Sequence, residues 1–140
     1  MKSFKLKVTN IISKNKTSTQ DVLIGQLNPV IRGWANYHRH IIAKYTFKLV
    51  DNFLFNSLWR WAKRRHSRKS AHWVRNKYFQ THKNFNWTFR CRKTSLTLFQ
   101  AQSVTIKRHI KIKGIANPYD PLWDTYFEKR KRPRNNEARR

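Results

Sequence analysis

The sequence is poor in acidic residues. Among its 140 residues, 6 Asp and Glu stand against 32 Lys and Arg, a formal net charge of +26 at pH 7, and no acidic residue lies between Asp51 and Asp120. Surfaces of free-standing soluble proteins usually mix charges of both signs, so this stretch predicts a continuous positive surface. A domain with so much charge of one sign repels itself, and a polyanion is the expected partner. Nucleic acid is favoured over an anionic membrane.

Cysteine and long apolar runs are also scarce. The single cysteine, Cys91, excludes a disulfide framework and a cysteine-based zinc site within the chain, and we expect it to be a partly buried thiol. No apolar run reaches the length that a bilayer span requires. The N-terminus, "MKSFKLKVTN", lacks the apolar block of a secretory signal. These absences predict a protein without a membrane partner, in the cytoplasm or nucleoid or in an organelle matrix.

Large apolar side chains are abundant, by contrast. Hydrophobic residues make up 39% of the chain and aromatic residues 14%, which is enough for a core and argues against wholesale disorder. The length allows one ordinary domain or two small pieces that share a core. A first amphipathic helix is predicted almost from the N-terminus, because Phe4, Val8 and Ile11 recur at helical spacing. Polar residues 17–21 supply N-cap candidates for a short helix through Ile24.

The stretch "LNPVIRGWANYHRH" predicts another helix, with Asn28 as N-cap and Pro29 at the first helical position. Successive side chains in a helix turn by about 100°. One side of the predicted helix is mainly apolar and faces the core: Val30, Ile31, Trp34, Tyr37, His38 and Ile41. The other side is polar and basic: Arg32, Asn36 and Arg39.

A longer helix is predicted from about Thr46 to Arg65, and its apolar positions cover so much of the circumference that it should be central to the fold. Leu54, Leu58 and Trp61 are its predicted core residues, and Trp59 is also interpreted as core rather than as a base-stacking platform. The end of this helix runs into the dense basic segment "RWAKRRHSRKS". Ser70 can cap a further short helix that reaches Phe79.

The hydrophobic period then changes. Residues 86–92, "NWTFRCR", alternate as a strand does, and "SLTLF" and "VTIKRHIKIKG" continue with β-branched alternation. These segments predict a small antiparallel β element. Pro121 opens a predicted short helix, Leu122 to Lys129, and the basic tail after it should be mobile. The predicted fold class is therefore mainly α (α+β): a small helical bundle, a small antiparallel β element and a short C-terminal helix.

Three segments, taken together, resemble a known family. "LNPVIRGWANYHRH", "LWRWAKRRHSRKSAHWVRNKYF" and "RHIKIKGIANPYDPLWDTYFEKR" are similar, in this order, to the C-terminal region of group II intron-encoded proteins. That region contains the maturase-specific domain (domain X, the thumb of the reverse transcriptase) and a DNA-binding segment. Residues that match its motifs are Arg32, Gly33, Trp34, Asn36, Tyr37 and Arg39, then Trp59, Arg60, Trp61, Lys63, Arg64, Arg65 and His66, and finally Asn117, Pro118, Asp120, Pro121 and Trp123.

The resemblance implies a mostly helical thumb that binds group II intron RNA and assists its folding and splicing. It implies a helical maturase domain over residues 1–80, a small β-containing segment that binds DNA or RNA over 81–130, and a basic flexible tail over 131–140. A DNA target and a separate reverse transcriptase acting in trans are the further partners that it allows. The chain has no Tyr-x-Asp-Asp polymerase motif and no Cys-x-x-Cys pair, and we expect a truncated or stand-alone thumb.

The predicted contacts to nucleic acid fall into two groups. The RNA-binding group is Arg32, Asn36, Arg39, Arg60, Lys63, Arg64, Arg65, His66, Arg68, Lys69, Arg75 and Lys77. The group in the C-terminal segment is Arg90, Arg92, Lys107, Arg108, Lys111 and Lys113. For any single arginine on a helix, a solvated surface position is the competing interpretation.

Three classes of function compete: an RNA-binding splicing cofactor, a basic structural protein of the ribosomal kind or a remnant without function, and an enzyme. The six histidines could indicate a nuclease, but metal-assisted phosphodiester cleavage needs neighbouring carboxylates. Asp120, Asp124 and Glu128 are spaced four residues apart at the short helix predicted from Pro121. Negative charge stabilises the start of a helix, so stabilisation of this helix explains these residues without a metal ion. We therefore expect no catalytic residue, no metal site, no cofactor and no enzymatic activity, and favour the splicing cofactor.

Overall fold

The computed structural model describes residues 1–41, 43–107 and 111–131 and divides into two compact units, Met1–Arg108 and His109–Arg140. In the first unit, the helices come first in the chain and a small antiparallel hairpin follows. The helices are α1 (Lys2–Lys14), α2 (Gln20–His38), α3 (Lys44–Arg65) and α4 (Ala71–Tyr78), and the hairpin strands are β1 (Phe79–His82) and β2 (Phe85–Phe89). The predicted mainly α fold class is confirmed.

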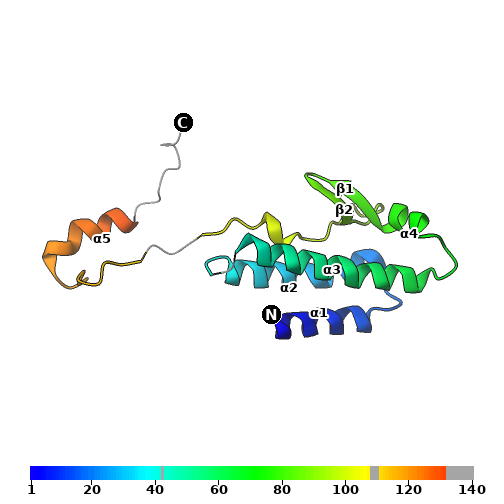
Figure 1. The fold of residues 1–140 in the computed structure, drawn as a ribbon, viewed down its shortest axis with the longest axis horizontal. Coiled ribbons are helices and arrows are strands. Elements are labelled where there is room, and N and C mark those ends of the chain that lie inside the picture. Colours follow the sequence, from blue (N-terminus) through cyan, green and yellow to red (C-terminus); the bar gives the residue numbers. More distant parts are fainter. Residues whose placement is uncertain (42, 108–110, 132–140) are drawn as a thin grey trace. The chain divides into compact units, whose positions relative to one another are not determined.

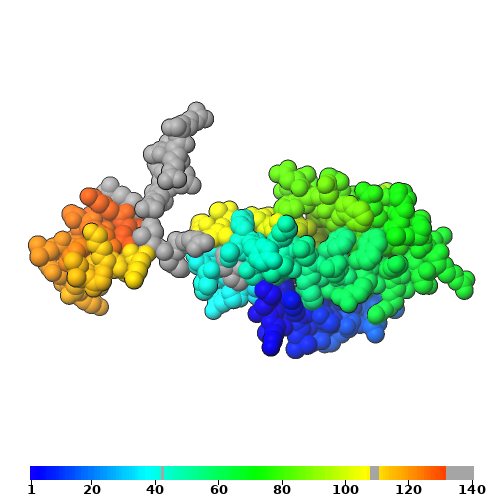
Figure 2. All heavy atoms as spheres, viewed as in Figure 1, coloured from blue at the N-terminus to red at the C-terminus, as the bar shows by residue number. Residues whose placement is uncertain are grey.

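Helices α1, α2 and α3 lie side by side (Figure 1). Short connections join them, as expected for antiparallel neighbours, and the atoms of α1 lie directly against those of α3 (Figure 2). The core between the helices is apolar because each contributes residues at three- and four-residue spacing. It includes Phe4, Val8, Leu23, Ile24, Leu27, Ile31, Ala35, Phe47, Val50, Leu54, Leu58, Trp61 and Ala62. Trp34 is partly buried and packs against this core.

The predicted break at Asn28 and Pro29 is wrong, because α2 runs without interruption from Gln20 to His38 with Pro29 inside it. A proline in a helix interior removes one hydrogen bond and costs about 3 kcal/mol. The apolar stripe through Leu27 and Ile31 continues across this position, and both side chains are fully buried. Burial of one such side chain contributes about 1.5–3 kcal/mol, so the continuous stripe offsets the cost.

Tyr37 and Ile41, predicted to face the core, are exposed instead, with 77% and 79% of their surface accessible. The buried face of α2 centres near Ile31 and Ala35. Six residues of helix place Tyr37 about 120° away from Ile31 around the axis, which is outside that face. Helix α2 ends at His38, so Ile41 is beyond the reach of its periodicity.

The hairpin is shorter and more irregular than the alternation predicts. Strand β1 pairs antiparallel with β2, with Phe79 opposite Phe89, and a bulge interrupts the register after Gln80. Trp87 has a positive φ of 59°, so its side chain leaves the alternating pattern. The predicted strands after residue 92 are wrong for the residues described, where an isolated bridge between Arg90 and Thr97 is the extent of pairing.

Helix side chains, rather than a neighbouring strand, hold the segment after the hairpin. The Asn28 amide donates to the Thr97 carbonyl (3.0 Å), and its side-chain oxygen accepts from the Phe99 N–H (2.8 Å). The Asp51 carboxylate accepts from the N–H groups of the 3-10 turn η1 (Ala101–Ser103). Lys44 Nζ donates to the carbonyl of Val104 (2.9 Å). The backbone N–H and carbonyl groups of this extended segment therefore find hydrogen-bond partners without a sheet. This explains why the alternating sequence led to a wrong prediction of strands.

The second unit contains a 3-10 turn, η2 (Pro121–Trp123), followed by α5 (Asp124–Lys131). The Asp120 carboxylate accepts from the Leu122 N–H (3.0 Å) and caps the turn, and the predicted C-terminal helix is confirmed. The Tyr126 hydroxyl accepts from the Lys113 N–H (3.1 Å), which ties the preceding segment to α5. Of the tail predicted as basic and flexible over residues 131–140, residue 131 ends α5 and residues 132–140 lie outside the described residues.

Candidate nucleic-acid interface

The first unit leaves almost all of its positive charge uncompensated by carboxylates. Residues 1–107 contain two acidic residues, Asp21 and Asp51. Asp51 points inward, where its two carboxylate oxygens accept from the N–H groups of Ala101 (2.8 Å) and Gln102 (3.0 Å). Burial raises the pKa of the Asp51 carboxyl, although these two backbone hydrogen bonds oppose the shift. One of the two carboxylates is therefore withdrawn from the surface, and the positive surface remains.

The end of α3 is fixed to the connection between α1 and α2. The guanidinium of Arg65 lies over the Trp61 ring, 4.6 Å from its centroid, and donates to the carbonyls of Lys16 and Ser18. The Trp61 indole N–H donates to the Asn15 carbonyl (2.9 Å). Arg65, predicted as an RNA contact, is thus also a structural bridge, so its substitution should affect folding as well as binding.

His66 lies just beyond α3, where it meets α4. One ring nitrogen is 2.7 Å from the Tyr78 hydroxyl and 3.5 Å from Lys77 Nζ, and the ring meets Trp73 edge-on at 4.7 Å. Desolvation lowers the pKa of His66, and the neighbouring cations Lys77, Arg65 and Lys69 lower it further. The lowered pKa favours the neutral imidazole at pH 7, and that imidazole sits among cations that an approaching phosphate would neutralise.

Cations and aromatic rings are paired around α4. Lys69 Nζ lies 5.5 Å and Lys77 Nζ 4.8 Å from the centroid of Trp73. The Arg75 guanidinium lies 4.5 Å from the centroid of Trp87, and Trp87 is 41% exposed. Ser70, the predicted N-cap of α4, accepts from the Trp73 N–H (3.3 Å). Exposed aromatic rings beside cations are suited to unpaired nucleotides, because the ring stacks on the base while the cation meets the phosphate.

Trp87 belongs to an aromatic cluster that the sequence did not reveal. Its ring lies 6.1 Å from Phe55 and 6.0 Å from Trp59, and both of these also contact Phe79. Trp59 was interpreted as a core residue, and it is half-buried in this cluster against the core. The alternation of residues 86–92 predicts a regular strand and does not reveal the positive φ that accompanies the exposed position of Trp87.

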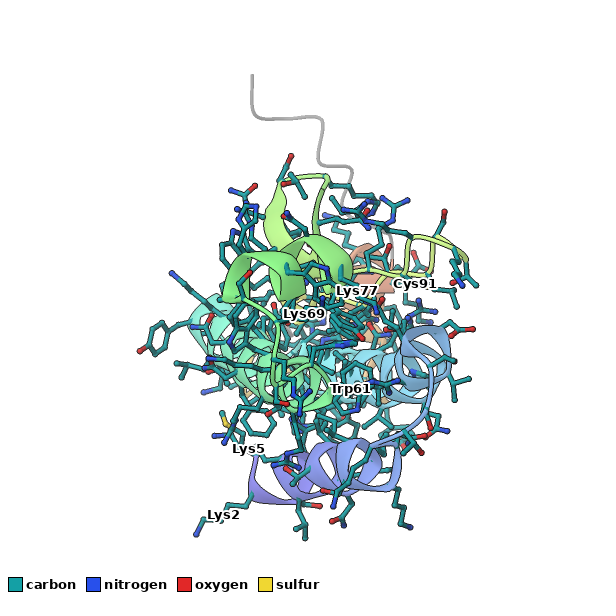
Figure 3. The ribbon with its side chains drawn as sticks, turned by 90° about the vertical axis from the view of Figure 1, so that its right-hand side faces the viewer. Lys2, Lys5, Trp61, Lys69, Lys77 and Cys91 are labelled. Carbon is teal, nitrogen blue, oxygen red and sulfur yellow. The ribbon has the colours of Figure 1, made fainter. Side chains whose placement is uncertain are left out.

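A cavity of about 900 Å³ lies at this same end of the first unit. We call it the end cavity. It is lined by Thr19, Gln20, Asp21, Arg65, Ser70, His72, Trp73, Asn76, Lys77, Tyr78, Cys91, Arg92, Lys93 and Thr94. Segments distant in sequence meet here, and Lys69, Lys77 and Cys91 lie at the end of the first unit that faces the viewer in Figure 3.

Most residues of the predicted RNA-binding group that make described contacts lie in two separate regions. Arg65, His66, Lys69, Arg75 and Lys77 lie at the end of α3, in the connection to α4 or on α4, which we call the α3–α4 end. Two of them, Arg65 and Lys77, line the end cavity together with Gln20 at the start of α2. At the other end of α2, the Arg39 carbonyl accepts from the Lys107 N–H (3.2 Å), and the Arg32 guanidinium lies 5.1 Å from the centroid of Phe99. We call Arg32, Arg39 and Lys107 the α2–α3 end. The rise along α2 from Gln20, which lines the end cavity, is about 18 Å to Arg32 and about 28 Å to Arg39. The remaining members of the group are exposed on helix surfaces or in the following turn: Asn36, Arg60, Lys63, Arg64 and Arg68.

The predicted contacts of the C-terminal segment do not form one cluster in the described residues. Arg90 is 3.1 Å from the His82 ring nitrogen, and Arg92 donates to the Asn76 carbonyl (2.6 Å) at the rim of the end cavity. Lys111 and Lys113 belong to the second unit, where Lys113 Nζ lies 5.7 Å from the centroid of Tyr126. Arg108 lies outside the described residues.

Two other kinds of site are missing from the part of the chain that the structure describes. No three His, Cys, Asp or Glu side chains there are grouped so that they could hold a metal ion. No helix there combines the length and the apolar character needed to cross a membrane.

Comparison with known protein families shows the family to which the chain belongs. The sequence model of the family "Group II intron, maturase-specific domain" matches residues 1–79. The chain belongs to this family. The match covers α1 to α4 and thus all three bundle helices, together with Arg65, His66, Trp73 and Lys77 of the interface. No curated protein matches the chain. The maturase-specific domain predicted from the sequence motifs is confirmed, and the DNA-binding segment stays a prediction.

Proposed function

We propose that this chain binds group II intron RNA through the positive surface of its maturase-specific domain and assists the folding of that RNA. Membership of the family implies a maturase-type role in intron splicing. The observation that carries the proposal is the α3–α4 end, where cations lie over aromatic rings within the family-matched residues. Such a surface neutralises phosphates and offers rings to unpaired bases.

We also propose that the chain has no polymerase or endonuclease activity of its own. Two-metal chemistry needs several carboxylates that converge on one substrate. The acidic residues of this chain are few and dispersed: Asp21, Asp51, Asp120, Asp124, Glu128 and Glu137. Asp51 is occupied by backbone N–H groups, and Asp120 caps η2. A splicing cofactor can act through binding energy alone, since it has to stabilise folded RNA rather than carry out the reaction.

For the C-terminal residues 81–130 we propose a supporting contact to RNA or to a DNA target. Cations lie beside an aromatic ring in the second unit, with Lys113 and Arg130 each 5.7 Å from the Tyr126 centroid. A reverse transcriptase supplied in trans would complete the set of partners.

Salt dependence tests the binding surface. The triple variant Arg64→Gln, Arg68→Gln, Lys69→Gln removes exposed cations and spares the structural bridge Arg65. Each lost phosphate contact should reduce the log–log slope of affinity against salt by about 0.7–0.9. The purified protein, a fluorescent intron RNA and a salt titration measure this slope.

A triple variant of equal charge provides the control. Lys2→Gln, Lys7→Gln and Lys48→Gln are exposed on α1 and α3, and Lys2 lies far from Lys69 and Lys77 in Figure 3. The control should keep a slope closer to that of the wild type. Equal slopes in the wild type and in the Arg64, Arg68, Lys69 variant would rule out this surface as the RNA contact.

A further inference from the structure

We propose that the end cavity holds one unpaired guanine nucleotide of the bound RNA, with the base read by Asp21. This inference rests on the proposed function, because it names the part of the RNA that the α3–α4 end recognises. The cavity volume of about 900 Å³ falls within the range of about 300–1,000 Å³ typical of small-molecule sites. It is large enough for a flipped-out nucleotide and too open for a structural void.

The aromatic wall of the end cavity can stack a base. Trp73 and Tyr78 both line it, and Trp73 is held in place by contacts with His66 on one side and by Lys69 and Lys77 above its ring. Stacking on such a ring accepts every base, since each has a π face. Trp73 therefore accounts for capture of an unpaired base, and the choice among bases must come from polar groups.

The cationic rim can hold the phosphate of the same nucleotide. Arg65, Lys77, Arg92 and Lys93 all line the cavity. The bond from Arg92 to the Asn76 carbonyl (2.6 Å) uses one of the five N–H donors of its guanidinium, so the group is fixed in orientation while others can reach a phosphate oxygen. Four cations are more than one phosphate requires, which makes a carboxylate in their midst tolerable.

Asp21 is the feature that makes the cavity selective. It is one of the two carboxylates among residues 1–107, and the other, Asp51, is buried against η1. Hydrogen bonds from the Thr19 side chain and from the backbone N–H groups of Asp21 and Val22 lower the pKa of Asp21, and nearby Lys93 acts in the same direction, so the group is an anion at pH 7. An ionised carboxylate only accepts hydrogen bonds. On a surface that binds a polyanion it repels phosphate, and its remaining lone pairs can accept from the donating edge of a base.

Guanine is the base whose pairing edge fits such an acceptor. Its N1–H and N2–H groups are adjacent donors that can meet both oxygens of one carboxylate. Adenine and cytosine each present one amino donor beside a ring nitrogen that accepts, and uracil presents one N–H between two carbonyls. Only guanine therefore avoids placing an acceptor against the second carboxylate oxygen, which explains the preference from hydrogen-bonding chemistry alone.

Base-substituted RNA tests the proposal on the wild-type protein. The probes are fluorescent uridine heptamers with guanosine, inosine, 7-deazaguanosine, adenosine or cytidine at the central position, together with the unsubstituted heptamer. Fluorescence anisotropy measures their affinities for the protein at constant salt. We expect guanosine to bind about 5- to 100-fold more tightly than adenosine, cytidine or uridine, as for a good bidentate base contact. Inosine, which lacks the N2 amino group, should be intermediate. 7-Deazaguanosine should match guanosine, because it keeps the pairing edge and alters only N7.

Asp21→Asn should remove the preference for guanosine, since the amide replaces one acceptor by a donor, while the affinity for plain uridine RNA should be kept or slightly increased. Glu128→Gln makes the same change of charge at an exposed site in the second unit and should keep the preference. Trp73→Phe, which preserves a stacking ring, should weaken all heptamers alike.

The outcomes distinguish this inference from the proposed function. Salt-dependent binding without any base preference overturns the guanine site and leaves the RNA-binding function intact. A preference that survives Asp21→Asn, or that disappears with 7-deazaguanosine, shows that another group reads another edge and also overturns the assignment. Absence of salt-dependent RNA binding by the wild type refutes the proposed function itself.

Discussion

The α3–α4 end and the α2–α3 end carry similar charge in different surroundings. At the α3–α4 end, Lys69 and Lys77 lie over the Trp73 ring, and Lys77 and Trp73 line the end cavity. At the α2–α3 end, Arg32 lies over Phe99, and the neighbouring Tyr37 is 77% exposed. The positive charge alone does not make the two ends differ in RNA binding, because it attracts any phosphate backbone. Both ends have rings beside the charge, but the α3–α4 end also has the end cavity, which allows an unpaired base to be recognised, so we expect the α3–α4 end to discriminate between kinds of RNA.

The largest expected effect is on the stability of the α3–α4 end. Trp61 is 5% exposed, supports Arg65 and donates to the Asn15 carbonyl. Trp61→Ala should lower the free energy of unfolding by about 3–5 kcal/mol, as for other buried aromatic residues. Trp34→Ala, at a partly buried ring, should cost less. Chemical denaturation measures both, and an equal loss in the two variants would contradict the difference in burial.

Asp51 tests how the segment after the hairpin is held. Asp51→Ala leaves the N–H groups of Ala101 and Gln102 without their acceptor and should cost about 2–4 kcal/mol. Asp51→Asn keeps one acceptor oxygen and should cost less. Thermal and chemical unfolding of the three proteins check this order, and a loss as large for the Asn variant as for the Ala variant would show that the charge rather than the hydrogen bonds matters.

The pH dependence of the same position has a definite sign. Burial raises the pKa of Asp51 above its ordinary value of 3.8, so the native state binds this proton more tightly than the unfolded chain does. The resulting stabilisation is complete below pH 3.8 and is lost as the pH rises through the native pKa. Relative to Asp51→Asn, the wild type should therefore gain stability as the pH falls from neutral. A constant difference between the two proteins across this range would argue against a buried, titrating carboxyl.

The two ends should differ in RNA selectivity. Lys69→Gln with Lys77→Gln should weaken binding of single-stranded RNA more than binding of duplex RNA, because both lysines flank Trp73. Arg32→Gln with Lys107→Gln should weaken both RNAs alike. Each double variant should reduce the salt slope by up to about 1.4–1.8. Affinities for a hairpin loop and for a matched duplex give the ratio, and the same ratio in both variants would remove the distinction between the ends.

The smallest expected effect is a pH effect at His66. Desolvation lowers its pKa below 6.5, and the neighbouring cations add to this, so the unfolded state binds the proton more readily. Its contribution to stability is present above pH 6.5 and decreases as the pH falls through the native pKa. A bound phosphate should raise the pKa again, so RNA affinity should increase below pH 6.5 by less than about tenfold, the effect of one pKa unit. His66→Gln should reduce this increase, and an unchanged pH profile would exclude His66 from the contact.

Helical periodicity was a sound guide where one face packs against a core. It predicted α3 to within two residues of its start, together with Leu54, Leu58 and Trp61 as apolar positions on it. It was misleading at Pro29, because the local cost of a proline is visible in sequence while the compensating burial is not. Tyr37 was misplaced for a related reason, since the width of the buried face depends on which neighbours approach the helix.

The sequence by itself determined the mainly helical class, the excess of positive charge and, through its ordered motifs, the maturase-specific family, because each depends on composition or on residues close together in the chain. Tertiary structure alone decided where that charge lies beside aromatic rings and a cavity. Asp21 and Lys77 are far apart in sequence, yet both line the end cavity with Arg92. Asp51 and Asn28, isolated polar residues in helical patterns, fix the extended segment after the hairpin. Such contacts depend on how helices pack over long distances in the chain, and local periodicity contains no record of that packing.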